Sequence, residues 1–213
     1  MKYKLVIFDL DGTLLDTLDD LSAAVNHAMQ QRGFPLHTRS EYMKMVGHGA
    51  RNLMSQALPM EHKDDEALID AALADFRTYY NAHIDVYTKP FPGIQELIAA
   101  LHQKGVMLAV ASNKFQEGTE HLIKEFFPEI PFVAVLGNRQ GFPLKPDPEV
   151  VGEVLRKAGI SKDQAVMVGD SDTDMETAAN GGIQGIAVNW GYREMSDWNH
   201  VDNVEELQKT LFL

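Results

Sequence analysis

The chain has 213 residues, 45% of them hydrophobic and 23% charged, which is an ordinary composition for a folded globular protein. Its 31 acidic side chains outnumber the 19 basic ones, and the net charge of −12 disfavours nucleic acid and anionic membrane surfaces as partners. The absence of cysteine excludes disulfides, thiolate metal sites and cysteine nucleophiles.

The apolar runs of the sequence are all short. None approaches the length that a bilayer-spanning helix needs, and the first run, at residues 4–8, is cut by Asp9, so it does not resemble a secretory signal. We therefore expect a cytoplasmic protein that has no membrane partner.

Five of these runs predict buried β-strands, at residues 4–8, 106–111, 132–136, 165–168 and 186–188. They lack polar alternation, which is typical of strands covered on both faces in a parallel sheet. Helical patterns separate them at residues 93–101, 147–158 and 173–180. Alternating strands and helices predict a doubly wound α/β domain with right-handed crossovers.

A different pattern occupies residues 17–84, which contain no strand-like run. An apolar stripe at helical spacing begins at Leu18 and continues through Leu21 and Val25, and further helical patterns follow at residues 39–45, 50–58 and 64–81. We predict an α/β core formed by residues 1–16 and 85–213, with an all-helical domain at residues 17–84 inserted after the first strand.

Polar side chains follow the predicted strands. Open α/β sheets bind ligands at the carboxyl ends of their strands, so these side chains should meet along one edge of the sheet. They are Asp9 and Asp11 after the first strand, Ser112 and Asn113 after the second, Lys145 in the loop after the third, and Asp170 and Asp174 after the fourth.

Asp9 and Asp11 lie two residues apart, directly before Gly12 and Thr13. A sharp turn at the glycine would bring both carboxylates to one site, where they repel each other unless a cation or a shared proton intervenes. The second acidic cluster after the fourth strand, with no His or Cys beside it, favours a hard divalent ion and Mg²⁺ first of all. The alternative is a turn with two solvated aspartates.

Lys145 lies between Pro143 and Pro146, and rigid chain on both sides can hold its ammonium in one direction. Aimed into a carboxylate cluster, it would orient a nucleophile and neutralise a phosphoryl oxygen; otherwise it is an ordinary loop lysine. Ser112 and Asn113 offer a hydroxyl and an amide that suit phosphoryl oxygens. Their alternative role is to cap the helix that follows them.

Four motifs in this order resemble those of the haloacid dehalogenase superfamily, and more narrowly its phosphoglycolate-phosphatase-like branch. They are FDLDGT at residues 8–13, Ser112-Asn113, Lys145-Pro146, and GDSDTD at residues 169–174. The resemblance implies a Rossmann-like core with a five-stranded parallel sheet. It also implies that residues 17–84 form the helical cap that these enzymes carry after the first strand.

The resemblance implies a role for each motif residue. Asp9 would be the nucleophile that forms an aspartyl-phosphate, and Asp11 would protonate the leaving oxygen and then activate water. Lys145 would stabilise Asp9 and the transferring phosphoryl group, whose oxygens Ser112 and Asn113 would bind. The implied Mg²⁺ ligands are a carboxylate oxygen of Asp9, the backbone carbonyl of Asp11 and a carboxylate of Asp170, with Asp174 supporting them directly or through water.

Within the predicted cap, the segment Val46-Gly47-His48-Gly49-Ala50 resembles the Val-Gly-x-Gly-Ala loop of phosphoglycolate phosphatases. Glycine permits close backbone approach and the start of a following helix can receive an anion, so Gly47 is a candidate substrate-binding residue. Arg51 would pair with a substrate carboxylate. Alternatively, the glycines form only a turn between helices and Arg51 is solvated.

Together the motifs predict a Mg²⁺-dependent phosphatase of a small phosphorylated metabolite, with 2-phosphoglycolate as the first candidate, acting as a monomer or weak dimer. A sugar-phosphate mutase or a pyrophosphatase on the same scaffold is an open alternative. A haloacid dehalogenase fits less well, because that chemistry needs neither Asp11 nor an acidic metal cluster. Outside enzymes, a phosphate-binding, receiver-like module combines similar residues, but receivers are shorter and have no helical insert.

Overall fold

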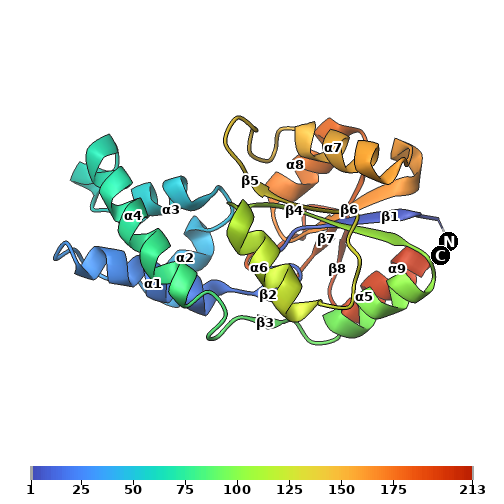
Figure 1. Cartoon of the computed structure of the whole chain (residues 1–213), viewed down its shortest axis with the longest axis horizontal. Coiled ribbons are helices and arrows are strands. Elements are labelled where there is room, and N and C mark those ends of the chain that lie inside the picture. The colour runs from blue at the N-terminus through green and yellow to red at the C-terminus, as the bar shows by residue number, and fades with distance from the viewer. Residues whose placement is uncertain (1, 213) are drawn as a thin grey trace. The chain divides into compact units, whose positions relative to one another are not determined.

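The computed structural model describes residues 2–212, which form two compact units (Figure 1). One unit contains residues 2–16 and 90–212 and is built around a parallel sheet, whereas the other contains residues 17–89 and is helical. The chain therefore passes between the units twice, at residues 16–17 and 89–90.

A six-stranded sheet forms the centre of the α/β unit, in the order β5-β4-β1-β6-β7-β8, and its neighbouring strands pair in parallel. The strands are β1 (Leu5–Phe8), β4 (Met107–Phe115), β5 (Ala134–Asn138), β6 (Ala165–Gly169), β7 (Gln184–Val188) and β8 (His200–Val201). All five predicted strands are present, but the predicted total of five was wrong, because β8 adds a sixth. A strand of two residues is too short to produce a periodic pattern in the sequence.

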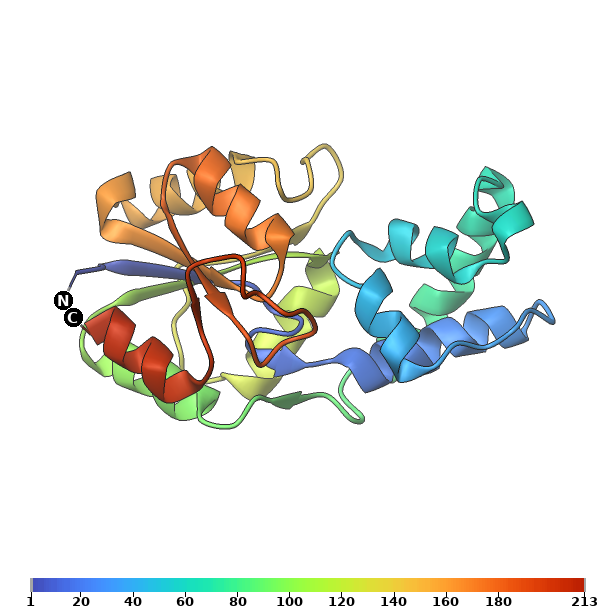
Figure 2. The same cartoon turned by 180° about the vertical axis from the view of Figure 1, so that it is seen from behind.

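Helices cover both faces of this sheet, with α7 and α8 together on one face and α5 and α9 together on the other (Figure 1, Figure 2). Val151 and Val154 of α7 belong to the same buried hydrophobic cluster as Leu5 and Ile7, which are alternate residues of β1 on one face of the sheet. Because β1 is covered on both faces, its whole sequence is apolar. The helices of this unit are α5 (Ile94–Gln103), α6 (Gln116–Phe126), α7 (Glu149–Ala158), α8 (Asp172–Gly181) and α9 (Val204–Phe212), with a 3₁₀ turn at Lys162–Gln164.

The carboxyl end of β4 contains a register shift. Ala111 pairs with Leu136 and Phe115 pairs with Asn138, so four steps along β4 match two steps along β5. The irregular segment is Ser112-Asn113-Lys114. Because a bulge breaks the strict alternation of side chains, it can direct three consecutive polar residues to the edge where the strands end.

The helical unit contains α1 (Leu18–Gln30), α2 (Arg39–Met45), α3 (Ala50–Ala57), a 3₁₀ turn (Met60–His62) and α4 (Glu66–Ala82). Helix α1 packs against α4, and Val25, Phe76 and Tyr80 are buried in this unit. Thr38 and Glu41 form a reciprocal capping box at the start of α2, which satisfies backbone donors that the helix itself leaves open. The unit therefore has a hydrophobic core and capped helices of its own.

The two passages of the chain between the units are short. Strands β2 (Leu15–Asp16) and β3 (Lys89–Pro90) form a separate two-stranded sheet there. Next to them, the buried carboxylate of Asp20 accepts hydrogen bonds from the backbone N–H groups of Tyr87 and Thr88 and from the Thr88 hydroxyl. Asp20 thus ties the start of α1 to the segment by which the chain leaves the helical unit.

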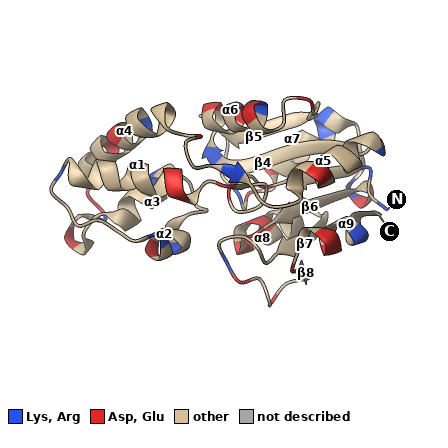
Figure 3. Cartoon of the chain, turned by 90° about the horizontal axis from the view of Figure 1, so that it is seen from below, with Lys and Arg blue, Asp and Glu red and all other residues tan. Residues whose placement is uncertain are grey.

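Figure 3 shows Asp and Glu on helices of both units with Lys and Arg interspersed among them. Within the part of the chain that the structure describes, no helix combines the length and the apolar character that a bilayer crossing demands.

Candidate active site

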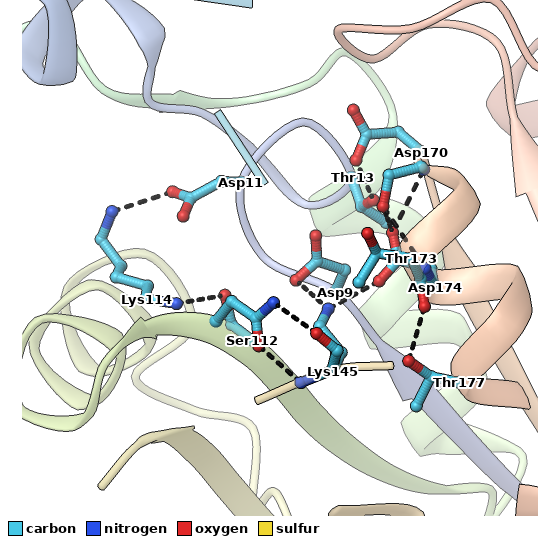
Figure 4. Close-up of polar contacts among 12 residues, drawn as sticks. Asp9, Asp11, Thr13, Ser112, Lys114, Lys145, Asp170, Thr173, Asp174 and Thr177 are labelled. Carbon is cyan, nitrogen blue, oxygen red and sulfur yellow. Dashed lines mark hydrogen bonds and ion pairs between the residues drawn. The ribbon is translucent and has the colours of Figure 1, made fainter. Parts of the chain in front are cut away.

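Three buried carboxylates meet at the carboxyl edge of the sheet (Figure 4). Asp9 follows β1, Asp170 follows β6, and Asp174 lies in the first turn of α8. One oxygen from each lies within 4.8 Å of the others, and Asp174 has no exposed surface. Since β1 and β6 are neighbouring parallel strands, their ends bring together residues that are far apart in the sequence.

Lys145 bridges two members of this cluster. Its Nζ donates to Asp9 Oδ1 at 2.8 Å and to Asp174 Oδ1 at 2.6 Å, and its side chain is only 4% exposed. The Lys145–Pro146 peptide bond is cis. The predicted aim of this lysine into the carboxylate cluster therefore agrees with the geometry, although its catalytic role stays a prediction.

Asn113 holds the backbone of Lys145. Its Oδ1 accepts the Lys145 N–H at 2.8 Å, and its Nδ2 donates to the Lys145 carbonyl at 3.1 Å. The side chain thus positions the lysine, a role that the sequence did not suggest, while phosphate binding by Asn113 stays a prediction. The alternative of capping a helix does not describe it, because α6 begins at Gln116 with Phe115 as its N-cap residue.

Asp174 has protein donors on both carboxylate oxygens. Oδ1 accepts from Lys145, and Oδ2 accepts from the Ser171 hydroxyl at 2.6 Å and the Ser171 N–H at 3.2 Å. Ser171 and Asp174 form the capping box of α8. These bonds favour a supporting role for Asp174 beside a metal over direct ligation.

Asp170 is held by two loops. Thr13 Oγ1 donates to its Oδ1 at 3.3 Å, and the Tyr192 N–H donates to its Oδ2 at 2.8 Å. Gly12 has φ +87°, and a side chain at Gly12 or at Gly191 would overlap the Asp170 carboxylate. Glycine is therefore required at both positions for close approach as well as, at Gly12, for the left-handed backbone.

Asp11 lies on the same rim but points toward Lys114 and away from Asp9 (Figure 4). Lys114 Nζ donates to Asp11 Oδ1 at 2.9 Å, and the lysine side chain is 3% exposed. The sequence analysis assigned no role to Lys114. Its position in the sequence could have pointed to a role, since Lys114 directly follows Ser112-Asn113 at the end of a predicted strand.

The loop after β7 contributes residues that the sequence analysis also missed. Trp190 Nε1 donates to the Thr13 carbonyl at 3.1 Å, and the Tyr192 hydroxyl donates to Asp16 Oδ1 at 3.2 Å. With the Tyr192 N–H on Asp170, this loop fixes both the first motif and the fourth. The rule that ligand sites form at strand ends pointed to this loop, but residues 189–192, which make these contacts, are uncharged.

A family model of haloacid dehalogenase-like hydrolases matches residues 6–188. The chain belongs to the haloacid dehalogenase-like hydrolase family. Phosphoglycolate phosphatases from Mesorhizobium japonicum and Aliivibrio fischeri are each 34% identical to it, and the matches cover 91% and 96% of this chain and 86% and 89% of theirs. The crystal structure of a candidate phosphoglycolate phosphatase from Lactobacillus delbrueckii subsp. bulgaricus has a TM-score of 0.90 at 35% identity and covers 99% of both chains.

Family membership confirms the resemblance on which the site assignments were based. A hydrolase family whose matching relatives are phosphatases supports an enzyme of the phosphatase type over a receiver-like binding module. The similarity extends over nearly the whole length of this haloacid dehalogenase-like hydrolase, so it includes the four motifs and the helical unit together.

The electrostatics of the site of this hydrolase leave negative charge in excess. Burial raises the pKa of Asp9 from 3.8 to about 7, with Lys145 opposing the shift and Asp174 adding to it. Burial also raises the pKa of Asp170 well above the usual value, and the charges of Asp9 and Asp174 add to this. Burial disfavours the charged form of Lys145, but Asp174 and Asp9 outweigh it and raise the lysine pKa, so the ammonium stays charged.

The donor set fits Mg²⁺. The cluster offers only carboxylate oxygens, which hard divalent cations prefer, and Lys145 contacts two of its three acidic groups. Burial is the main cause of the raised pKa values of Asp9 and Asp170, and a divalent ion would offset the cost of keeping these carboxylates charged. Asp9 and Asp170 are the residues best placed to hold it.

Two further predicted residues lie in the helical unit. Gly47 has φ +116°, and Gly49, with φ +83°, is the N-cap residue of α3. Arg51, in the first turn of α3, forms ion pairs with Glu66 and Asp70 of α4. Arg51 is exposed but paired, so binding of a substrate carboxylate would have to compete with these two partners.

Proposed function

We propose that this hydrolase is a Mg²⁺-dependent phosphatase that cleaves a small phosphomonoester through an aspartyl-phosphate on Asp9, with 2-phosphoglycolate as the first candidate substrate. The observation that carries the proposal is the 2.8 Å ion pair of Lys145 with Asp9 inside a buried carboxylate cluster. Phosphoryl transfer depends mainly on positioning and charge stabilisation, so a carboxylate needs cations beside it to attack a phosphate dianion.

In the first step, an oxygen of Asp9 forms a bond to phosphorus while the bond between phosphorus and the ester oxygen breaks. Asp11 gives its proton to that oxygen, so the product leaves as an alcohol. The Ser112 hydroxyl donates to a phosphoryl oxygen. Its Oγ accepts the Lys114 N–H at 3.2 Å, so the hydroxyl proton points elsewhere.

In the second step, a water molecule loses a proton to Asp11 and attacks phosphorus, and the bond between phosphorus and Asp9 breaks. Inorganic phosphate leaves, Asp9 is again a carboxylate, and Asp11 is again protonated. The sum of the two steps converts one phosphomonoester and one water into one alcohol and one phosphate.

Bound Mg²⁺ would supply the positive charge that draws the phosphate dianion toward Asp9. We assign its ligands to Asp9, Asp170 and the backbone carbonyl of Asp11. Lys145, which Asp174 holds, keeps the Asp9 carboxylate in place, and Thr13 and Tyr192 keep the Asp170 carboxylate in place.

We assign the choice of substrate to the helical unit, with residues 17–84 acting as the cap and with Gly47 and Arg51 binding the substrate. The similarity to phosphoglycolate phosphatases at 34% identity supports 2-phosphoglycolate, whose carboxylate is a suitable partner for an arginine. We further propose a cytoplasmic enzyme, monomeric or weakly dimeric, that acts on free small metabolites.

The test is a panel of phosphate compounds assayed for released phosphate and for isomerised product, with Mg²⁺ and with EDTA. It contains 2-phosphoglycolate, sugar phosphates and pyrophosphate. The proposal expects phosphate release from 2-phosphoglycolate that EDTA abolishes. Isomerisation of a sugar phosphate without release would instead identify a mutase, and cleavage of pyrophosphate alone would identify a pyrophosphatase.

Asp9→Asn tests the nucleophile in the same assay. We expect a loss of turnover of at least about 10³-fold, since the covalent step has no substitute nucleophile. Asp163→Asn is the matched control, because this exposed aspartate lies in the 3₁₀ turn before β6, at the opposite end of that strand from Asp170. Retained turnover in the Asp9 variant would refute the mechanism.

A further inference from the structure

Lys114 is a second buried lysine at the site, beyond the motif lysine. Lys114 as a whole is 7% exposed, and its ammonium nitrogen lies 2.9 Å from Asp11 Oδ1. Removing a charge from water is costly unless the charge is well paired, so a chain rarely keeps a buried ammonium without a partner for it. Here the partner is the carboxylate to which the proposed function assigns proton transfer.

The local backbone fixes where this ammonium lies. Lys114 belongs to the register-shifted segment of β4, and its N–H donates to Ser112 Oγ at 3.2 Å. Lys114 thus contacts two groups of the proposed reaction, the hydroxyl of Ser112 through its backbone and the carboxylate of Asp11 through its side chain.

The division of the lysines between the carboxylates is also informative. Lys145 contacts Asp9 and Asp174, whereas Lys114 contacts Asp11. Each of the two aspartates of the first motif therefore has its own ammonium. The two lysines come from different strand ends, so they can hold the two carboxylates in different directions, as Figure 4 shows.

We propose that Lys114 is a positioning residue for the proton-transfer step, an inference that rests on the proposed function of Asp11. An ammonium donates and cannot accept, so the oxygen that faces it, Asp11 Oδ1, stays unprotonated. The proton that Asp11 gives to the leaving oxygen, and later takes from water, is therefore carried on Oδ2. Lys114 selects this oxygen and holds the carboxyl group in one orientation.

The structural alternative is that Lys114 only neutralises Asp11, and a third possibility is that it binds the phosphoryl group directly. The leaving group of the substrate distinguishes these three roles of Lys114. An alkyl phosphate needs a proton on its leaving oxygen, whereas p-nitrophenyl phosphate releases a stable phenolate and does not. A residue that positions the acid affects the first substrate far more than the second, whereas a residue that binds phosphate affects both alike.

The experiment measures kcat/KM of the Mg²⁺-loaded full chain for 2-phosphoglycolate, or for the best alkyl phosphate of the panel, and for p-nitrophenyl phosphate. Lys114→Met keeps the length of the side chain and removes its charge. We expect a loss of about 10–100-fold on the alkyl phosphate and of less than about 3-fold on the aryl phosphate, within the range that positioned acid–base groups contribute. Lys124→Met, at an exposed lysine of α6, is the matched control.

A double-mutant cycle with Asp11→Asn gives the decisive comparison. If Lys114 acts through Asp11, Lys114→Met causes no further loss in the Asp11→Asn background. Equal losses on both substrates, or an added loss in that background, would overturn the inference. Lys114→Arg, which retains the charge, should recover most of the alkyl-phosphate activity, and the melting temperature of each variant shows whether it is folded.

The result that would refute the role of Lys114 differs from the result that would refute the proposed function. An active Asp9→Asn variant refutes the proposed function. An inactive Asp9→Asn variant together with additive effects of the Lys114 and Asp11 substitutions refutes only the role of Lys114.

Discussion

Asn113→Ala tests whether this residue holds Lys145. The substitution removes the acceptor of the Lys145 N–H at 2.8 Å and the donor to the Lys145 carbonyl at 3.1 Å. Both residues are 6% exposed, so water does not readily replace the lost partner. A net hydrogen bond contributes about 1 kcal/mol, and leaving a buried polar group unsatisfied costs about 1–3 kcal/mol. We therefore expect the free energy of unfolding to fall by about 2–4 kcal/mol.

For a chain of this length, that loss lowers the melting temperature by about 5–15 °C, which a thermal melt measures directly. The activity should fall by about 100-fold in kcat, because Lys145 loses its fixed position beside Asp9, and a small misplacement has effects of this size. Asn81→Ala, at an exposed asparagine of α4, is the control and should change neither quantity. An unchanged melting temperature with a raised KM would show that Asn113 contacts the substrate and does not hold Lys145.

Five further predictions concern the site and the helical unit. Gly191→Val should abolish stabilisation by Mg²⁺ in a thermal melt, because its side chain would overlap the Asp170 carboxylate. Since native Asp9 has a pKa raised from 3.8 to about 7, the metal-free protein should lose stability as the pH rises between these values, because the native state holds a proton that the unfolded chain has released. In the same way, the Mg²⁺ dissociation constant from titration calorimetry should rise about 5-fold from pH 7 to pH 6, because Mg²⁺ must displace the proton of Asp9. Asp20→Ala should speed amide hydrogen exchange at Thr88, because that N–H loses its acceptor. Arg51→Met should raise KM for 2-phosphoglycolate and leave p-nitrophenyl phosphate unchanged; an equal effect on both would remove Arg51 from the substrate site.

The elements of the fold followed well from the sequence, because hydrophobic periodicity is a local property. The predicted helix at residues 39–45 coincides with α2, and the apolar run at residues 165–168 lies within β6. Strand β8 was missed because it has two residues and depends on pairing with β7. Its backbone hydrogen bonds, which no side-chain pattern announces, make it part of the sheet.

The grouping of Asp9, Asp170 and Asp174 was also predictable, because carboxyl ends of parallel strands meet at one edge. The partners of these groups were not. Asn113 lies 32 residues from Lys145, and Lys114 lies 103 residues from Asp11, so no local spacing links either pair. The directions of the Asn113 and Lys114 side chains depend on the register shift in β4, and that of Asp11 depends on the turn at Gly12.

By itself, then, the sequence determined the strand and helix pattern, the motif set and hence the family, since each depends on residue types at short spacings. Only the tertiary structure decided which amide positions Lys145, which lysine pairs with Asp11, and which loop holds Asp170. It also showed that Arg51 already has carboxylate partners in α4. The physical reason is that hydrogen bonds and ion pairs depend on direction and distance to within a few tenths of an ångström, and packing between distant segments sets both.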